Sequence, residues 1–163
     1  MIDTSVVIEL ERIDLDDLPN EIAISWITVA ELSAGPHATD DPEERARRQD
    51  RLQRVQTTFD PIPFDGDAAR AYGRIYAAVR RAGRKARGRR FADLLIAATA
   101  LGAGLPLYTR NPADFEGLAA LVEIVEIVEL KRWPRELSAG RGSPRRTPRP
   151  ARRRCARARS PRP

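Results

Sequence analysis

Residues 91–100 read FADLLIAATA, a nearly all-apolar run that carries a single acid, Asp93. The run predicts a helix over 91–101, closed by the glycines that follow it. A helix that is apolar all round is buried, and an unpaired carboxylate in such a place is costly. Asp93 therefore needs a partner, which is a cation, a cap role in the first turn, or a salt bridge to Arg89 or Arg90. We interpret it as a metal-binding or site carboxylate.

Short apolar runs alternate with helical patterns on both sides of this helix. The apolar runs lie at 1–8, 22–27, 61–64, 105–109 and 121–128. Helices are expected from residue 28, over 42–59 and over 65–81, the last with Ala69, Tyr72, Gly73, Tyr76 and Val79 on one face. Strands that alternate with helices imply βαβ units. The predicted fold class is therefore α/β, with helices on both faces of a mainly parallel sheet.

The charge of the chain is divided unevenly along its length. The formal net charge is +6, but residues 138–163 contain ten arginines and no acid. Removing those ten from the 29 basic residues leaves 19 against 23 acids, a net charge of −4 for residues 1–137. The part of the chain that can fold is thus mildly acidic.

The composition changes after Trp133-Pro134 to Arg, Pro, Ser, Gly and Ala. Such a segment buries too little apolar surface to offset its ordering entropy. We therefore expect one domain over 1–134 and a disordered, basic Arg/Pro-rich tail over 135–163. An RNA-binding arm, a plain extension and a reading-frame artefact all fit this composition, and we favour an auxiliary or non-functional tail.

Composition also excludes several classes of protein. The single cysteine, Cys155, rules out a disulfide framework, which suits a reducing compartment. No apolar run reaches the roughly 18–20 residues of a membrane span, and the N-terminus lacks the basic and apolar regions of a signal peptide. We expect a cytoplasmic protein with no membrane partner.

Three further acids stand at strand ends or helix starts, near the edge of an open parallel sheet where ligands bind. Asp3 follows the first apolar residues, although its Asp-Thr-Ser sequence is also turn chemistry. Glu31 fits a capping box in which Thr28 caps the helix. Asp114 follows an Asn-Pro pair in which Asn111 would cap. Each acid thus has a local alternative role.

Together, Asp3, Glu31, Asp93 and Asp114 suit a hard cation. Mg²⁺ prefers oxygen ligands, often one or two carboxylates plus water and phosphate, and it activates water in phosphodiester cleavage. Zinc would need Cys and His ligands, and the chain has one of each. The sequence has no phosphate-binding glycine loop, dinucleotide fingerprint or nucleophile elbow. These observations favour metal-dependent phosphodiester chemistry.

Four stretches, in this order, resemble the PIN-domain toxins of VapBC toxin–antitoxin modules: IDTSVVI at 2–8, ITVAEL at 27–32, ADLLIAATA at 92–100 and LYTRNPADF at 107–115. The resemblance implies a three-layer α/β/α PIN-like domain and Mg²⁺- or Mn²⁺-dependent endoribonuclease activity on structured RNA, commonly tRNA or ribosomal RNA. It also implies a homodimer, and a small VapB-like antitoxin whose C-terminal segment enters the acidic pocket, often with an arginine.

The resemblance also implies roles for individual residues. Four acids are expected to form the catalytic pocket: Asp3, Glu31, Asp93 and Asp114. Three of them are expected to bind metal: Asp3, Asp93 and Asp114. Three hydroxyls are expected to help orient the metal or water: Thr4, Ser5 and Thr109. Many relatives carry the fourth acid at the position of Asn111, and others have Asn there and the acid three residues on, so the fourth ligand is Asp114, Asn111 or a water-mediated contact.

A basic stretch lies immediately before the 91–101 helix, with candidate RNA contacts at Arg84, Lys85, Arg87, Arg89 and Arg90. Contacts to phosphates there would supply salt-dependent affinity without reading bases. The alternative is a solvated charge run. The main rival to a ribonuclease is a non-catalytic RNA-binding module of the same fold, which would bind RNA without Mg²⁺.

Overall fold

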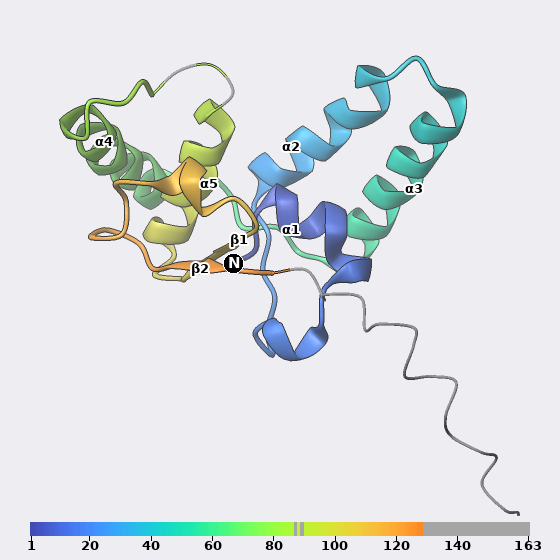
Figure 1. Ribbon diagram of the computed structural model, residues 1–163, viewed down its shortest axis with the longest axis horizontal. Helices are drawn as coiled ribbons and strands as arrows, with labels where there is room; N and C mark the ends of the chain where they lie inside the picture. Colours follow the sequence, from blue (N-terminus) through green and yellow to red (C-terminus); the bar gives the residue numbers. More distant parts are fainter. Residues whose placement is uncertain (87, 89, 129–163) are drawn as a thin grey trace, which may run out of the picture. The chain divides into compact units, whose positions relative to one another are not determined.

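The computed structural model of the 163-residue chain describes residues 1–86, 88 and 90–128 (Figure 1). The predicted tail over 135–163 and the predicted domain end at 134 lie outside these residues, as do Arg87 and Arg89. In the part of the chain that the structure describes, no helix combines the length and apolar composition that crossing a membrane requires.

The helices, in chain order, are α1 (Thr4–Glu9), α2 (Trp26–Ala34), α3 (Pro42–Thr58), α4 (Gly66–Arg81) and α5 (Arg90–Gly102). Shorter 3₁₀ turns are η1 (Leu10–Arg12), η2 (Leu15–Asp17), η3 (Gly35–Ala38) and η4 (Pro112–Phe115). The strands β1 (Leu107–Thr109) and β2 (Ile124–Glu126) pair in parallel. The helices predicted over 42–59, 65–81 and 91–101 are confirmed as α3, α4 and α5.

Single residues extend the sheet beyond β1 and β2. Ile2 forms a parallel bridge with Tyr108, and Ser25 forms one with Ile62. A hydrogen bond of 2.9 Å from Ile2 N to Ala23 O joins these two pairs. The first residues of the chain therefore lie between β1 and the segment before α2. The predicted parallel sheet is confirmed, in a form built largely from single bridges.

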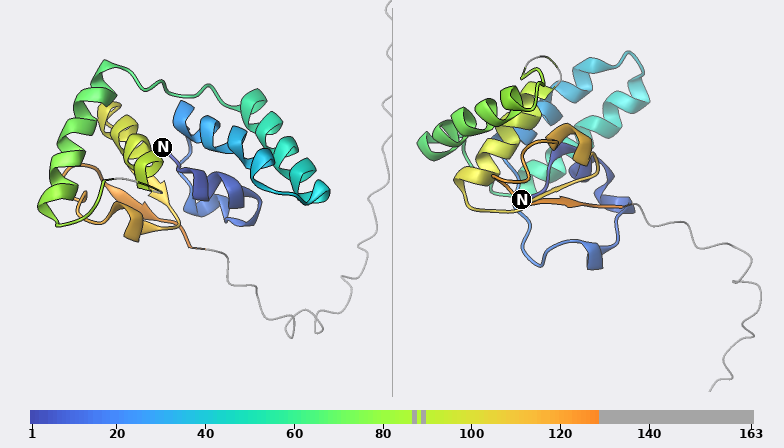
Figure 2. Two further views of the ribbon diagram at one scale, coloured as in Figure 1. Left: turned by 90° about the horizontal axis from the view of Figure 1, so that it is seen from above. Right: turned by 60° about the vertical axis from the view of Figure 1, so that its left-hand side comes forward.

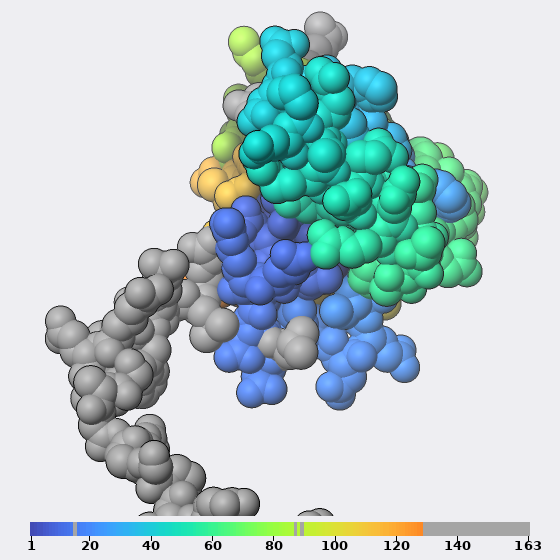
Figure 3. Space-filling model, turned by 90° about the vertical axis from the view of Figure 1, so that its right-hand side faces the viewer, coloured from blue at the N-terminus to red at the C-terminus, as the bar shows by residue number. Residues whose placement is uncertain are grey.

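Neighbouring residues of the central segments point to opposite faces of the sheet, as a period of two requires. Met1 and Leu107 pack in one core with α4 and α5, whereas Ile2 and Tyr108 pack in a second core with α1, α2 and α3. Figures 1 and 2 show these two groups of helices on opposite sides of the strands. Figure 3 faces the second group, with α3 over much of that face and α1 beside it. The predicted three-layer α/β/α arrangement is confirmed.

The extended run predicted over 1–8 is only partly correct. It stops at Asp3, because Asp3 is the N-cap of α1 and its Oδ1 accepts a hydrogen bond of 3.0 Å from Val6 N. Val6 and Val7, whose branched side chains favour a strand, are instead buried on a helix. Burial in the second core and the cap together override the local strand preference.

Helix α2 begins two residues before the predicted start at Thr28. Its N-cap is Ser25, whose Oγ accepts a hydrogen bond of 3.0 Å from Thr28 N. The capping box predicted for Thr28 and Glu31 is therefore wrong. Glu31 lies in the second turn of α2 and is not needed as a cap, which leaves its carboxylate available for other contacts.

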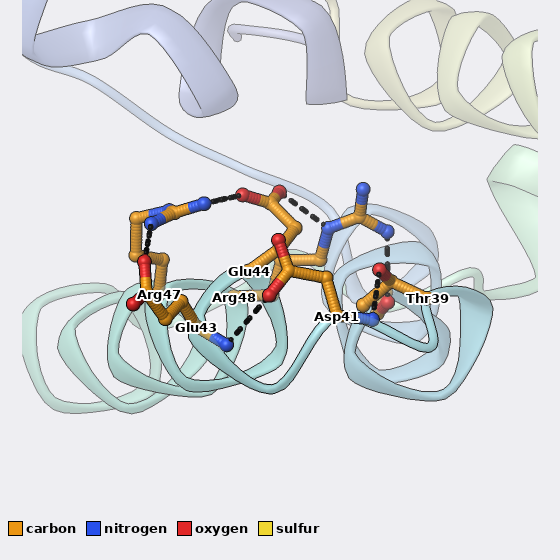
Figure 4. A network of polar contacts seen from close by, with 7 residues as sticks. Thr39, Asp41, Glu43, Glu44, Arg47 and Arg48 are labelled. Carbon is orange, nitrogen blue, oxygen red and sulfur yellow. Dashed lines mark hydrogen bonds and ion pairs between the residues drawn. The ribbon is translucent and has the colours of Figure 1, made fainter.

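The first turns of α3 carry an ion-pair network (Figure 4). Glu44 accepts hydrogen bonds from Arg48 Nε at 2.8 Å and Arg47 Nε at 3.0 Å. These bonds, first from Arg48 and then from Arg47, hold the pKa of Glu44 below its ordinary value. Arg48 also donates to Gly35 O at 2.9 Å, which ties α3 to η3. Arg48 thus links α3 to the turn after α2, whereas Arg47 pairs within α3.

The buried face of α4 consists of small and aliphatic residues: Ala68, Ala71, Ile75, Ala78 and Val79. It shares only Val79 with the apolar face predicted for this helix, and Tyr76 is instead 38 % exposed. Small residues let α4 approach α5 closely. At the end of α5, Gly102 lies directly against the backbone of Ala68.

Replacing Gly102 with alanine is expected to destabilise the domain, because the new Cβ would lie 2.8 Å from Ala68 N. Overpacking of this kind costs about 1–3 kcal/mol. Gly73→Ala is the matched control, since the Cβ position of Gly73 in α4 is open and alanine there should stabilise the helix by up to about 1 kcal/mol. Urea unfolding measures both effects, and equal stability of G102A and the unsubstituted chain would contradict the close contact.

Candidate active site

Asp3 is 4 % exposed, and short contacts orient its carboxylate. Oδ1 accepts hydrogen bonds from Ser5 Oγ at 2.7 Å and Val6 N at 3.0 Å, and Oδ2 accepts one from Thr109 Oγ1 at 2.6 Å. A carboxylate has about four acceptor positions, so Oδ2 keeps capacity for one more partner. The cap role and the site role considered for Asp3 are therefore compatible.

The hydroxyls that hold Asp3 also hold the turn after β1. Ser5 Oγ accepts a hydrogen bond of 3.1 Å from Arg110 N, and Thr109 Oγ1 accepts one of 3.0 Å from Asn111 N. Each hydroxyl thus donates to the carboxylate and accepts from the backbone. As a result, the start of the chain, α1 and the turn after β1 are connected through one buried side chain.

Glu31 reaches the same region from α2. Its Oε2 accepts a hydrogen bond of 2.5 Å from Thr4 Oγ1, the first residue of α1. Glu31 is half-buried. The Thr4 contact fixes one carboxylate oxygen of Glu31 next to the residue that follows Asp3.

Asp93 lies in the first turn of α5, about half-buried. Burial is the main cause that raises its pKa to about 6, followed by the negative charges of Asp114, Glu31 and Asp3. Arg90 acts in the opposite direction. The structure therefore brings all four predicted acids into one electrostatic neighbourhood, where like charges disfavour ionisation.

The salt bridge considered for Asp93 is not formed with Arg90. The Arg90 guanidinium donates to the backbone carbonyl of Asp114 rather than to the Asp93 carboxylate. The other proposed partner, Arg89, lies outside the described residues. Arg90 thus ties the start of α5 to η4. Sequence reasoning missed this contact because no local pattern links residues that are 24 positions apart.

Asp114 is the acid whose charge acts most strongly on Asp93. It lies in η4 and is half-buried, and its amide donates to Asn111 O at 3.0 Å. The cap expected from the Asn111 side chain is absent, because no side-chain cap hydrogen bond forms at the start of η4. Both candidates for the fourth ligand thus stand on the same turn. Of the two, Asp114 carries the charge that acts on Asp93.

The potential ligands in this neighbourhood are mainly side-chain oxygen atoms, the type of ligand that a hard cation prefers. Among the described residues, no three His, Cys, Asp or Glu side chains stand close enough together to form a complete metal site. Mg²⁺ often takes only one or two carboxylates and keeps several waters. The donor set therefore fits a partly hydrated Mg²⁺ or Mn²⁺ better than zinc, which favours nitrogen and sulfur ligands.

A groove of about 520 Å³ begins beside Thr4 and Glu31 and is bounded by α1, η1, α2 and α3. Charges of both signs line it: Glu9, Glu11, Arg12, Glu44, Arg47, Arg48 and Arg51. Glu44 already neutralises part of the positive charge of Arg47 and Arg48. The groove is thus a mixed-charge surface next to the acids.

The basic residues predicted to contact RNA differ in their contacts within the domain. Arg84 forms an ion pair of 2.5 Å with Glu116 and donates to Ala113 O at 3.2 Å. Arg84 and Arg90 therefore anchor η4. Lys85 is exposed.

The PIN domain family matches residues 1–121 of the chain. The chain belongs to the PIN-domain family. Ribonuclease VapC5 of Mycobacterium tuberculosis is 36% identical over 132 residues, covering 78% of this chain and 94% of that protein. VapC ribonuclease Y4jK of Sinorhizobium fredii is 33% identical over 137 residues, covering 77% and 94%.

The fold of this PIN domain is similar to that of a VapBC toxin–antitoxin family member, VapBC-5 from Mycobacterium tuberculosis. The TM-score is 0.66 at 36% identity, and the match covers 77% of this chain and 95% of that chain. The four stretches on which the family was predicted all lie within the matched residues. The predicted family and fold are thereby confirmed.

Thr109→Val is expected to lower the free energy of unfolding of this PIN domain by about 1–3 kcal/mol, because it removes a donor from a buried carboxylate. Thr99→Val is the matched control. Thr99 is equally buried, but its hydroxyl donates to Leu95 O within a helix, so its loss should cost less. Denaturant unfolding compares the two, and an equal loss would contradict the anchoring role of Thr109.

Asp93→Asn is expected to stabilise the metal-free domain at neutral pH. The pKa of Asp93 in the folded domain lies above its unfolded value of 3.8. The neutral form of Asp93 therefore stabilises the folded domain below about pH 4, and this stability is lost as the pH rises through about 6. Because the side chain is half exposed, we expect a gain of only about 1 kcal/mol at pH 7.5. Unfolding in EDTA at pH 4 and 7.5 measures it, and a pH-independent difference would contradict the crowding of acids.

Proposed function

We propose that this PIN domain is a metal-dependent endoribonuclease, the toxin of a VapBC-type toxin–antitoxin pair. The observation that carries the proposal is the crowding of three acids around Asp93, whose pKa is raised to about 6. Strongly perturbed carboxylates that gather in one place often mark functional sites. The relatives named as ribonucleases support RNA as the substrate.

Asp3 and Asp93 would hold Mg²⁺, or Mn²⁺ in its place, with Asp114 or Asn111 as a further ligand or as an anchor for coordinated water. When bound, such an ion lowers the pKa of water and offsets negative charge on the phosphoryl oxygens. Asp3 is oriented for this role by its contacts with Ser5 and Thr109, which leave acceptor capacity on Oδ2.

Glu31 would act on the attacking water. Thr4 Oγ1 holds Oε2 of Glu31 at 2.5 Å, so Oε1 can orient a water or accept its proton. Water then adds to phosphorus as the bond to the 3′ oxygen breaks. One RNA fragment keeps a 3′-hydroxyl, and the other carries a 5′-phosphate.

The finer substrate class that we propose is structured RNA, tRNA or ribosomal RNA, cut in an unpaired segment. Side chains cannot read the deep and narrow major groove of A-form RNA, whereas unpaired bases can be splayed out and contacted. Asp93 on α5 and Glu31 on α2 approach the substrate from two different helices. A single strand that passes between these helices would present one phosphate to both.

We propose a VapB-like antitoxin as protein partner and a homodimer as assembly, in a cytoplasmic setting. A toxin–antitoxin family member is among the similar solved structures. An arginine of such a partner would meet the four acids. The rest of its segment would find the mixed-charge groove of α1, α2 and α3 next to them.

The rival function is RNA binding without catalysis. One observation favours it: among the residues that the structure describes, no three acids are close enough to bind one ion as they stand. A binding module would hold RNA in the absence of Mg²⁺ and after Asp93→Asn. A ribonuclease would cut RNA only with both in place.

Cleavage of total cellular RNA by the full chain separates the two. We expect discrete fragments with Mg²⁺ and none with EDTA. The loss of a partner that merely supports a metal ligand costs about 10–100-fold, so Asp93→Asn should reduce cleavage by about 100-fold or more. Asp50→Asn, which removes an exposed acid of α3, is the matched control and should cleave like the unsubstituted chain.

Cleavage that survives both EDTA and Asp93→Asn would contradict the proposed mechanism. Binding of RNA without any cleavage by a folded chain in Mg²⁺ would favour the binding module.

A further inference from the structure

A hollow of about 270 Å³ lies where the end of α4 meets the loop that follows, and none of the four acids is among the described residues that line it. The described residues that line it are Tyr76, Arg80, Lys85 and Ala86. Ala86 is buried, whereas Arg80 and Lys85 are exposed. The hollow thus combines an aromatic ring, two cations and a buried alanine side chain.

A row of aromatic rings runs from this hollow to the start of α5. Tyr76 stacks at a tilt on Tyr72, and Tyr72 meets Phe91 edge to face, with ring centroids 6.2 Å apart in each pair. Phe91 belongs to the same helical turn as Asp93. The row therefore runs from the hollow to the first turn of α5, where Asp93 lies two residues further along and on a different side of the helix.

Two rings of this row are unusually open to solvent. Tyr76 is 38 % exposed and Phe91 is 49 % exposed. Exposed aromatic rings interleaved with cations are the surface on which unpaired bases stack while phosphates are neutralised.

The two cations of the hollow differ from Arg84 in their pairing. Arg84 is paired with Glu116, whereas neither Arg80 nor Lys85 has an ion pair within the described part of the chain. The acid site repels a polyanion, so RNA needs positive charge placed beside that site rather than within it. Arg80 and Lys85 supply that charge.

A second copy of the chain fits this surface less well. In a two-fold symmetric contact the same residues face one another across the axis. A contact centred on the hollow would bring Arg80 and Lys85 of one copy against those of the other, and like charges repel. A polyanion with flat, stackable bases complements both the charge and the rings.

We propose that the hollow binds one nucleotide of single-stranded RNA, with its base on Tyr76 and its phosphate on Arg80 and Lys85. The inference rests on the proposed ribonuclease function and deepens it. The aromatic row guides the strand from this nucleotide toward Asp93. This arrangement selects substrates whose unpaired segment is long enough to reach both the hollow and Asp93.

Binding of labelled oligouridine to the full chain carrying Asp93→Asn, in EDTA, tests the proposal without cleavage. Tyr76→Leu removes the ring and keeps an apolar side chain, so we expect about tenfold weaker binding. Tyr76→Phe keeps the ring and should bind within about twofold of the parent. An RNA duplex should be far less sensitive to Tyr76→Leu, since its bases are not free to stack.

The phosphate contacts have their own readout. Each phosphate contact adds about 0.7 to the slope of log affinity against log salt for a single strand. Because Arg80 and Lys85 contact the same phosphate in the proposal, the double variant Arg80→Ala, Lys85→Ala should flatten that slope by about 0.7. Arg74→Ala is the matched control, because Arg74 is exposed on the same helix and does not line the hollow.

Unchanged oligouridine binding by Tyr76→Leu and by the double variant would overturn the proposal, while RNA cleavage by the unsubstituted chain would leave the ribonuclease standing. A switch from dimer to monomer in Tyr76→Leu, measured by sedimentation, would also overturn it in favour of a contact between copies. Tyr76-dependent binding by a chain that never cleaves RNA would support the hollow and count against the ribonuclease.

Discussion

Three hydrogen bonds to the buried carboxylate of Asp3 hold together parts of the domain that are far apart in the chain. One caps α1, one comes from Ser5 within α1, and one comes from Thr109 at the end of β1. The backbone of the same residue donates to Tyr108 O at 3.0 Å, which places it inside the sheet. This carboxylate therefore helps to hold the sheet edge, the first helix and the turn that carries Asp114 in their relative positions. The residue that organises the fold is also a candidate ligand of the site.

A second constraint follows from the crowding of acids around Asp93. Burial and three neighbouring charges all disfavour its ionised form, so the ionisation of Asp93 at neutral pH costs the domain stability. Proteins tolerate such a cost where function requires it, and a bound cation would relieve it. The same negative charge would repel RNA, and in our proposal the exposed cations Arg80 and Lys85 offset that repulsion. In our proposal, the same cluster of carboxylates thus affects the stability of the domain, its affinity for a metal ion and the approach of RNA.

The sequence predicted the elements whose signals are local and failed where distant contacts decide. Helices α3 and α4 begin where Asp41 and Asp65 offer caps, and α5 follows from its apolar run. The short strand predicted at the start of residues 1–8 ends at Asp3, and a helix that buries Val6 and Val7 stands where a turn was expected, because tertiary burial and a cap outweigh the preference of branched side chains. The cap of α2 was misplaced because Ser25 and Thr28 both suit that role, and only the structure shows which one accepts the bond. Asp3, Asp93 and Asp114 were singled out because each follows a strand or opens a helix, and Glu31 for a capping box that the structure does not form. The pairing of Arg84 with Glu116 across 32 residues leaves no local trace.

Mn²⁺ binding, followed by loss of the free-ion electron paramagnetic resonance signal, tests most directly whether the four acids form a metal site. The full chain should bind Mn²⁺ saturably, Asp93→Asn should weaken that binding by about tenfold or more, and Asp50→Asn should leave it unchanged. Equal Mn²⁺ binding by the full chain and by Asp93→Asn would contradict the assignment of this cluster as the metal centre.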